Sequence, residues 1–71
     1  MIDNTLLILS RGKKGLSIRQ LSKESGVGAS TISKIENKKS TGSLLVASKL
    51  AKALDLEIDK LFILEGREEM K

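Results

Sequence analysis

Apolar residues recur along this chain at the three- and four-residue spacing of amphipathic helices, in five short stretches separated by glycines and polar residues. The first predicted helix begins near Asp3 or Asn4, either of which can cap it, and runs to about Lys14, where Gly15 follows. Leu7 is expected to face the core. Four consecutive apolar residues cover most of a helix circumference. One or two of the three apolar neighbours of Leu7 should therefore stay partly exposed, among Leu6, Ile8 and Leu9.

The next two predicted helices are joined by a very short turn. Ser17 and Gln20 have the spacing of a capping box for a helix over residues 18–25, which Gly26 ends. The following helix is expected over about residues 28–36, with Asn37 at its end. Two helices so closely connected must cross steeply, which is helix-turn-helix geometry, although a plain helical hairpin remains the alternative. The side chains expected to fill the angle are Leu21, Val27, Ile32 and Ile35, with the small Ser22 at the closest approach.

The remaining pattern predicts a loop over residues 38–42 and a helix capped by Ser43, followed by a turn at residues 55–57. The apolar stripe of this fourth helix is expected to be Leu44, Ala47, Leu50, Ala51 and Leu54. A short last helix runs from Ile58 to about Leu61 or Phe62. The fold class is therefore all-α, a compact five-helix domain over residues 1–63, with residues 64–71 as a C-terminal tail that could join a dimer interface.

Composition narrows the chemistry that this domain can perform. The 71 residues contain neither histidine nor cysteine, which removes the commonest general base, the commonest metal ligand and every thiolate site. The remaining serines, lysines and carboxylates show no activated arrangement. We therefore expect no enzyme, no metal and no cofactor.

Charge is distributed unevenly along the chain. Residues 11–52 contain ten Lys or Arg against two acidic residues, a net charge of +8, whereas residues 53–71 have a net charge of −3. A basic body favours a polyanionic partner, although a solvated lysine-rich surface would give the same count. The apolar run at residues 6–9 is far shorter than the roughly 20 residues of a membrane span. A cytoplasmic protein without membrane contact is expected.

The chain resembles the Xre/Cro-type helix-turn-helix family, the group that contains lambdoid phage repressors. The resemblance extends over Thr5–Phe62 and rests on the segments "KGLSIRQLSKESGVGASTISKIENKKS" and "LAKALDLEIDKLF". It implies a domain that binds double-stranded DNA, usually as a homodimer, with the third helix in the major groove. Three positions depart from the family's usual residues: Ile18 replaces a glutamine, Gly28 a Ser or Thr, and Gly42 a proline.

The resemblance and the helical register together predict the DNA contacts. Base edges are expected to meet Ala29, Ser30, Ser33 and Lys34. Phosphates are expected to meet the backbone at Ile18 and the side chains of Arg19, Thr31, Lys38, Lys39, Ser40 and Thr41, with Lys13, Lys14 and Lys23 as further candidates. Because no arginine, asparagine or glutamine stands at the base-reading positions, direct readout should be weak and DNA shape should supply part of the specificity.

Two further sets of residues follow from the family pattern. Arg11 and Glu36 occupy positions where family members often pair an arginine with a glutamate, so a partly buried ion pair is expected, with two separate exposed charges as the alternative. A dimer interface is expected from apolar residues without a clear core role, although the aromatic one could instead complete the core: Leu45, Phe62, Ile63 and Leu64.

The sequence therefore predicts a sequence-specific DNA-binding transcriptional regulator, and more narrowly a repressor. The alternative is a protein-interaction module, such as an antitoxin-like component that binds a partner protein. Ile18 and the short side chains of the reading helix favour the alternative, whereas the basic body and Lys38-Lys39 favour the regulator.

Overall fold

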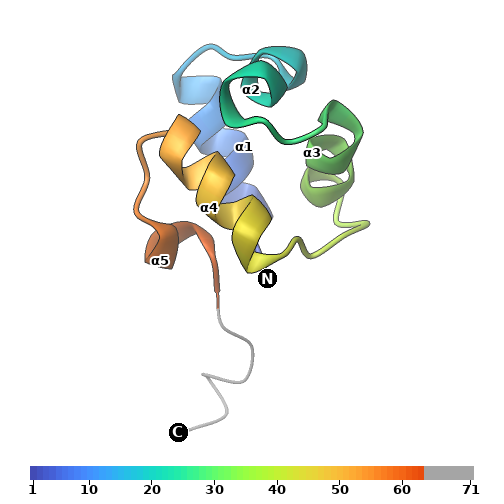
Figure 1. Cartoon of the computed structure of the whole chain (residues 1–71), viewed down its shortest axis with the longest axis vertical. Coiled ribbons are helices and arrows are strands. Elements are labelled where there is room, and N and C mark those ends of the chain that lie inside the picture. The colour runs from blue at the N-terminus through green and yellow to red at the C-terminus, as the bar shows by residue number, and fades with distance from the viewer. Residues whose placement is uncertain (64–71) are drawn as a thin grey trace, which may run out of the picture.

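Helices form at the five predicted places and nowhere else in the part of the chain that the structure describes. In this computed structural model, which describes residues 1–63, the helices are α1 (Asn4–Lys13), α2 (Ile18–Ser25), α3 (Ala29–Glu36), α4 (Leu44–Ala53) and α5 (Ile58–Leu61) (Figure 1). The all-α, five-helix fold class is thus confirmed. The predicted tail at residues 64–71, including Leu64, lies outside the described residues.

Side chains cap the N-termini of three helices. Asp3 Oδ1 accepts a hydrogen bond from the Leu6 amide at 3.2 Å, and Ser43 caps α4 in the same way. The predicted capping box of α2 is complete, because Ser17 Oγ accepts from the Gln20 amide at 3.1 Å and Gln20 Oε1 accepts from the Ser17 amide at 2.8 Å. Each such bond satisfies an amide that the first helical turn leaves without a backbone partner.

α1, α3 and α4 end with the same backbone conformation. After each helix a residue takes the left-handed conformation, with φ of +69° at Gly15, +62° at Lys38 and +58° at Asp55. The next amide then reaches back five residues, as from Lys39 to the Lys34 carbonyl at 2.7 Å, which is the Schellman arrangement. Only Gly15 adopts this conformation without a steric cost, since a side chain there costs about 1–2 kcal/mol.

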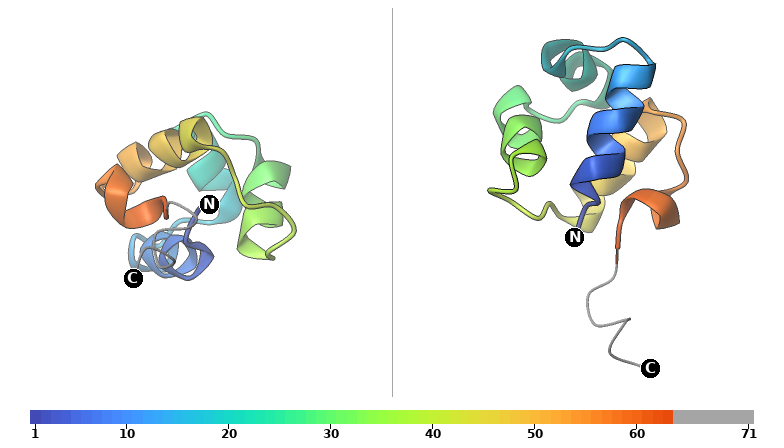
Figure 2. Two further views of the ribbon diagram at one scale, coloured as in Figure 1. Left: turned by 90° about the horizontal axis from the view of Figure 1, so that it is seen from below. Right: turned by 180° about the vertical axis from the view of Figure 1, so that it is seen from behind.

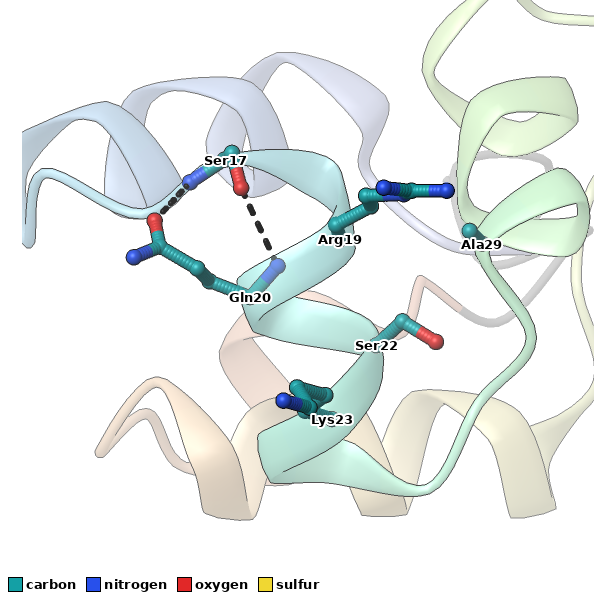
Figure 3. A pocket seen from close by; sticks show the side chains of 6 residues that line it. All are labelled: Ser17, Arg19, Gln20, Ser22, Lys23 and Ala29. Atoms are coloured by element: carbon teal, nitrogen blue, oxygen red, sulfur yellow. Dashed lines mark hydrogen bonds between the residues drawn. The ribbon is translucent and has the colours of Figure 1, made fainter.

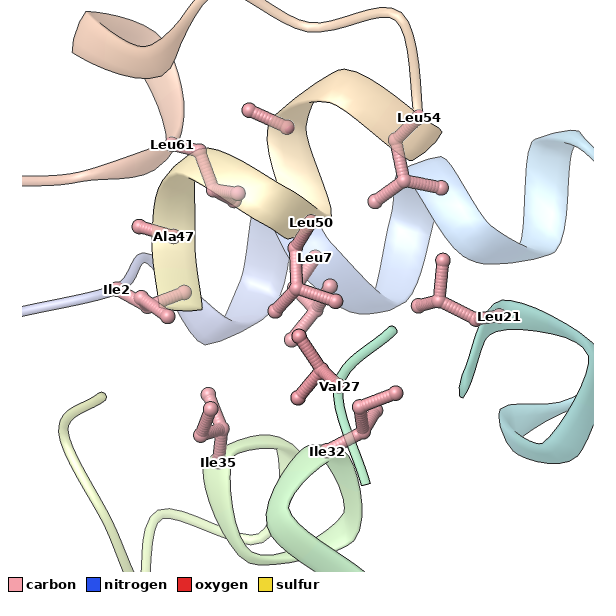
Figure 4. Packing of buried hydrophobic residues seen from close by; sticks show 11 residues of the cluster. Ile2, Leu7, Leu21, Val27, Ile32, Ile35, Ala47, Leu50, Leu54 and Leu61 are labelled. Carbon is pink, nitrogen blue, oxygen red and sulfur yellow. The ribbon is translucent and has the colours of Figure 1, made fainter. Parts of the chain in front are cut away.

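The core is aliphatic and draws on all five helices (Figure 4). The four side chains predicted to fill the angle between α2 and α3 are all buried, at 5% exposure or less, and Leu7, Ala47, Leu50, Ala51 and Leu54 are buried as expected. Of the neighbours of Leu7, Leu6 is half-buried whereas Ile8 and Leu9 are exposed. The prediction for Leu44 is wrong, because this side chain is 58% exposed. Leu44 is the first residue of α4, and its Cβ points back past the helix end, beyond the packed neighbours.

Ile2 is a core residue that the sequence pattern does not reveal. It is 1% exposed and forms an isolated antiparallel bridge with Phe62, while its amide donates to the Thr41 carbonyl at 2.7 Å. Gly42, with φ of +75°, leaves room for it, since a Cβ there would lie 2.9 Å from Ile2 Cγ1. Phe62 itself is half-buried and packs against the core.

The arrangement leaves α3 at the edge of the domain. In both views α3 and α5 lie on opposite sides of the pair formed by α1 and α4 (Figure 1; Figure 2, right). One face of α3 packs inward through Ile32 and Ile35, which are fully buried. Its other face is therefore free to meet a partner.

Candidate nucleic-acid interface

The turn between α2 and α3 sets the angle at which α3 is presented. Gly26 ends α2 with φ of +79°, a conformation that glycine adopts cheaply. Val27 is buried beneath the turn, and Gly28 is the N-cap residue of α3. Since Gly28 has no side chain, no side-chain hydrogen bond caps α3. The first amides of α3 are therefore left for water or for a ligand.

The predicted base-contacting residues lie along the outer part of α3. Ser30 and Lys34 are exposed, whereas Ala29 and Ser33 are half-buried. Ser33 Oγ accepts a weak hydrogen bond from Asn37 Nδ2 at 3.3 Å, and the same nitrogen donates to the Ser33 carbonyl at 2.9 Å. Asn37 was predicted only as a helix end, but it also places an amide beside this surface.

The loop after α3 presents the predicted phosphate contacts together. Its four side chains from Lys38 to Thr41 are all exposed. The backbone of the loop is held at both ends, by the Schellman bonds from Lys38 and Lys39 and by the bond between Thr41 and the Ile2 amide. Exposed cations on a fixed backbone are suited to contacting phosphates and to setting the register of a protein on a duplex.

A hollow separates α2 from the N-terminus of α3 (Figure 3). Its volume is about 670 Å³, and it is lined by Ser17, Arg19, Gln20, Ser22, Lys23 and Ala29. Arg19 and Lys23 are exposed, so the hollow is basic. Ile18 is half-buried against the core, so only its backbone is available for the predicted phosphate contact. Thr31, the other predicted phosphate contact on these two helices without a charge, is half-buried on α3.

The predicted ion pair between Arg11 and Glu36 is present. Arg11 Nε lies 2.7 Å from Glu36 Oε2 and Nη2 lies 2.9 Å from Oε1, while Nη1 donates to the Leu16 carbonyl at 2.9 Å. The hydrogen bond to Glu36 raises the pKa of Arg11, against the opposing effect of burial. Because Arg11 belongs to α1 and Glu36 is the last residue of α3, this two-pronged pair fixes the end of α3 against the core.

Lys14 has a different partner from the one that the sequence suggested. Its ammonium lies 2.8 Å from Asp55 Oδ2 and 3.5 Å from the Ala53 carbonyl, at the end of α4. The hydrogen bond between Lys14 and Asp55 lowers the pKa of Asp55 and raises the pKa of Lys14. Lys14 is therefore engaged with an acidic residue, whereas Lys13 and Lys23 are exposed.

Two kinds of site are absent from residues 1–63. No helix there is long and apolar enough to cross a membrane. Within the same span, no three side chains among histidine, cysteine, aspartate and glutamate gather closely enough to hold a metal ion.

Comparison with known proteins agrees with this geometry. The model of the helix-turn-helix family matches residues 7–61, so the chain belongs to this family, and within it to the Xre/Cro type. A solved structure of the complex between the SinR protein and the SinI protein is similar, with a TM-score of 0.79 and 29% sequence identity over 100% of this chain and 68% of that chain. No curated protein matches. Family and fold together support a DNA-binding transcription regulator of a non-enzymatic family.

Proposed function

We propose that this protein is a sequence-specific regulator that binds double-stranded DNA with α3 in the major groove and represses transcription there. The observation that carries the proposal is the exposed outer face of α3, which has exposed basic residues near both of its ends. Arg19 and Lys23 of α2 line the hollow beside Ala29 at the start of α3, and Lys38 and Lys39 are exposed on the loop that follows its end. A major groove about 12 Å wide accepts one α-helix, and basic residues near the ends of that helix can meet the phosphates that flank the groove.

Each group of residues has its own part in this proposal. Ser30, Ser33 and Lys34 donate to base edges, and the methyl group of Ala29 contacts a thymine methyl. The side chains of the loop contact phosphates on one strand, together with Thr31. The backbone amides at the start of α2, around Ile18, donate to a phosphate on the other strand. Repression follows from occupancy alone, since a domain bound over a promoter excludes the polymerase, and this would take place in the cytoplasm.

The bound form is proposed to be a homodimer. Leu45 is 66% exposed and Ile63 is 40% exposed, which makes them apolar surface without a partner among residues 1–63. Phe62 would contribute through its exposed part, and Leu64 belongs to the same proposal. A two-fold dimer would match a palindromic operator with half-sites about one helical turn apart. Light scattering on the free protein and on its DNA complex measures the number of chains in each.

A titration of labelled duplex tests the central proposal. The duplex contains the DNA around the protein's own gene, the control is a scrambled duplex, and both are titrated at several salt concentrations. We expect binding to the native duplex at least about 10³-fold tighter than to the scrambled one. If four to six phosphates are neutralised per monomer, log K should fall with log salt with a slope near 0.9 per contact. Equal binding to both duplexes would refute sequence-specific binding to that DNA.

The matched variant for this titration is Lys38→Ala/Lys39→Ala. Both side chains are exposed and make no side-chain contact that holds α3 in place, so the fold should be retained. The variant should bind native and scrambled duplexes more weakly by a similar factor, with a salt slope smaller by about two contacts. An unchanged slope would show that the loop does not meet phosphates.

A second function is favoured by one specific finding, namely that the similar solved structure is a complex of two proteins. In this alternative the domain binds a partner protein, as an antitoxin-like component does, through apolar surface such as Leu44 and Leu45. The two functions differ in the same titration. Absence of binding to either duplex, by a protein shown to be folded, would favour the protein-binding module.

A further inference from the structure

The side chains at the start of α3 are short, so they can distinguish few bases by themselves. The N-terminal residues of a recognition helix are the ones that reach base edges. Here the first of them are Gly28 at the N-cap and Ala29 at the first helical position, followed by Ser30. None of these three side chains extends beyond one atom past Cβ. A duplex docked against α3 would therefore meet only short side chains at this end of the helix, with space beside them for a longer one.

One long side chain from α2 extends toward that space. Figure 3 shows Arg19 projecting from the first turn of α2 with its guanidinium pointing toward Ala29, and both residues line the hollow. Arg19 is exposed, and the ion pairs among residues 1–63 involve Arg11 and Lys14 instead. Lys23 lines the same hollow one turn further along α2 and, in the same view, its ammonium points away from Ala29.

We propose that Arg19 reads a base, most simply a guanine, and is the principal specificity-determining residue of this domain. This inference rests on the proposed function and goes beyond the phosphate contact that the sequence suggests for Arg19. A guanidinium presents parallel N–H groups that match guanine O6 and N7 in the major groove, and this is the commonest specific contact between proteins and DNA. The small residues at the start of α3 are consistent with this role, because a longer side chain at residue 29 would obstruct Arg19 sterically.

The test compares sequence preference rather than affinity alone. The full chain and three variants, Arg19→Ala, Arg19→Lys and Lys23→Ala, each select from a pool of randomised duplexes at one fixed salt concentration, and the bound duplexes are sequenced. All three changes are at exposed positions, and circular dichroism verifies that each variant is folded. Lys23→Ala is the matched control, since it removes a positive charge from the same helix and the same hollow.

We expect the unchanged protein to select a guanine at one fixed position in each half-site. Arg19→Ala should reduce the preference at that position by about tenfold to a hundredfold and leave the other positions unchanged. Arg19→Lys should also lose the preference, because an ammonium is a point charge that does not reproduce the two parallel bonds. Lys23→Ala should bind more weakly but select the same sequence.

Two results would overturn the inference, and they are distinguishable. If Arg19→Ala weakens binding to all sequences equally and Arg19→Lys restores it, Arg19 contacts a phosphate, while the proposed regulator function still stands. If the unchanged protein selects no sequence at all, the inference fails together with the proposed function.

Discussion

Removing Arg11 should destabilise this domain more than any other single change to a charged side chain among residues 1–63. Arg11→Met retains the apolar stem but removes the guanidinium and its three hydrogen bonds, two to Glu36 and one to the Leu16 carbonyl. The carboxylate of Glu36, whose side chain is only 8% exposed, would then lack its cation. An unpaired buried charge of this kind costs about 3–5 kcal/mol. Because the Arg11 side chain is 21% exposed, so that water reaches it, we expect the lower end, about 3 kcal/mol.

That loss is large for a domain of this size. At about 0.05–0.15 kcal/mol per residue, a chain of 71 residues has about 4–11 kcal/mol of stability, so the variant would retain only part of it. The midpoint of thermal unfolding should fall by about 12–24 °C. Since the chain has no tryptophan or tyrosine, urea unfolding is best followed by the helical circular dichroism signal.

A double-mutant cycle separates the ion pair from other effects of the substitution. Glu36→Leu alone should destabilise, whereas Arg11→Met/Glu36→Leu should recover most of the loss, because an apolar pair replaces a buried ionic one at little cost. We expect a coupling free energy of about 2 kcal/mol. Lys14→Met, which breaks the exposed pair with Asp55, is the control and should change the midpoint only slightly. A loss below about 1 kcal/mol with no coupling would refute the reasoning, since it is the behaviour of a solvated surface pair.

Three other changes test features of the backbone and its surroundings. Gly42→Ala should destabilise by about 2 kcal/mol in urea unfolding, because it combines a positive φ with a Cβ that meets the buried Ile2 side chain; an unchanged midpoint would show that Ile2 can move aside. Ser17→Ala should cost about 1 kcal/mol through loss of the α2 cap, whereas Ser17→Asp should retain most of it. Asp55→Asn tests pH dependence. Because pairing with Lys14 lowers the pKa of Asp55, the pair stabilises the fold above the ordinary aspartate pKa of about 3.9, and this is lost as the pH falls through the lower folded-state value. The difference in thermal midpoint between the two proteins should thus be small but present at pH 7 and vanish in strong acid, and a constant difference would contradict this linkage.

Local sequence signals were sufficient for most of the fold. The bounds of α2 follow from Ser17, Gln20 and Gly26, because a capping box and a terminal glycine act within one helical turn. The burial of Leu21 and Ile32 follows from helical periodicity. Features that depend on distant parts of the chain were not predictable in this way. Ile2 belongs to the buried core and is bridged to a residue far along the sequence, and no periodic pattern exists at the start of the chain to indicate it.

The candidate site likewise contains features that the sequence predicted and features that only the fold revealed. Family resemblance was enough to predict the pairing of Arg11 with Glu36, and register was enough to place Ser30 and Lys34 on the open face of α3. The direction of the Arg19 side chain required the crossing of α2 and α3, since nothing in the spacing of residues 19 and 29 indicates that they line one hollow. The partner of Lys14 was missed for the same reason, because Asp55 follows it by 41 positions.

The bridge between Ile2 and Phe62 has a consequence for the order in which the fold assembles. Joining these residues closes a loop that contains all five helices, and the entropy cost of such a closure grows with the length of the loop. The closure becomes favourable only after α1 to α5 have packed and brought its two ends together, so it should be a late event in folding. During synthesis, α2 and α3 can therefore pair while α5 is still within the ribosome, but the bridge from Ile2 forms only after Phe62 has emerged.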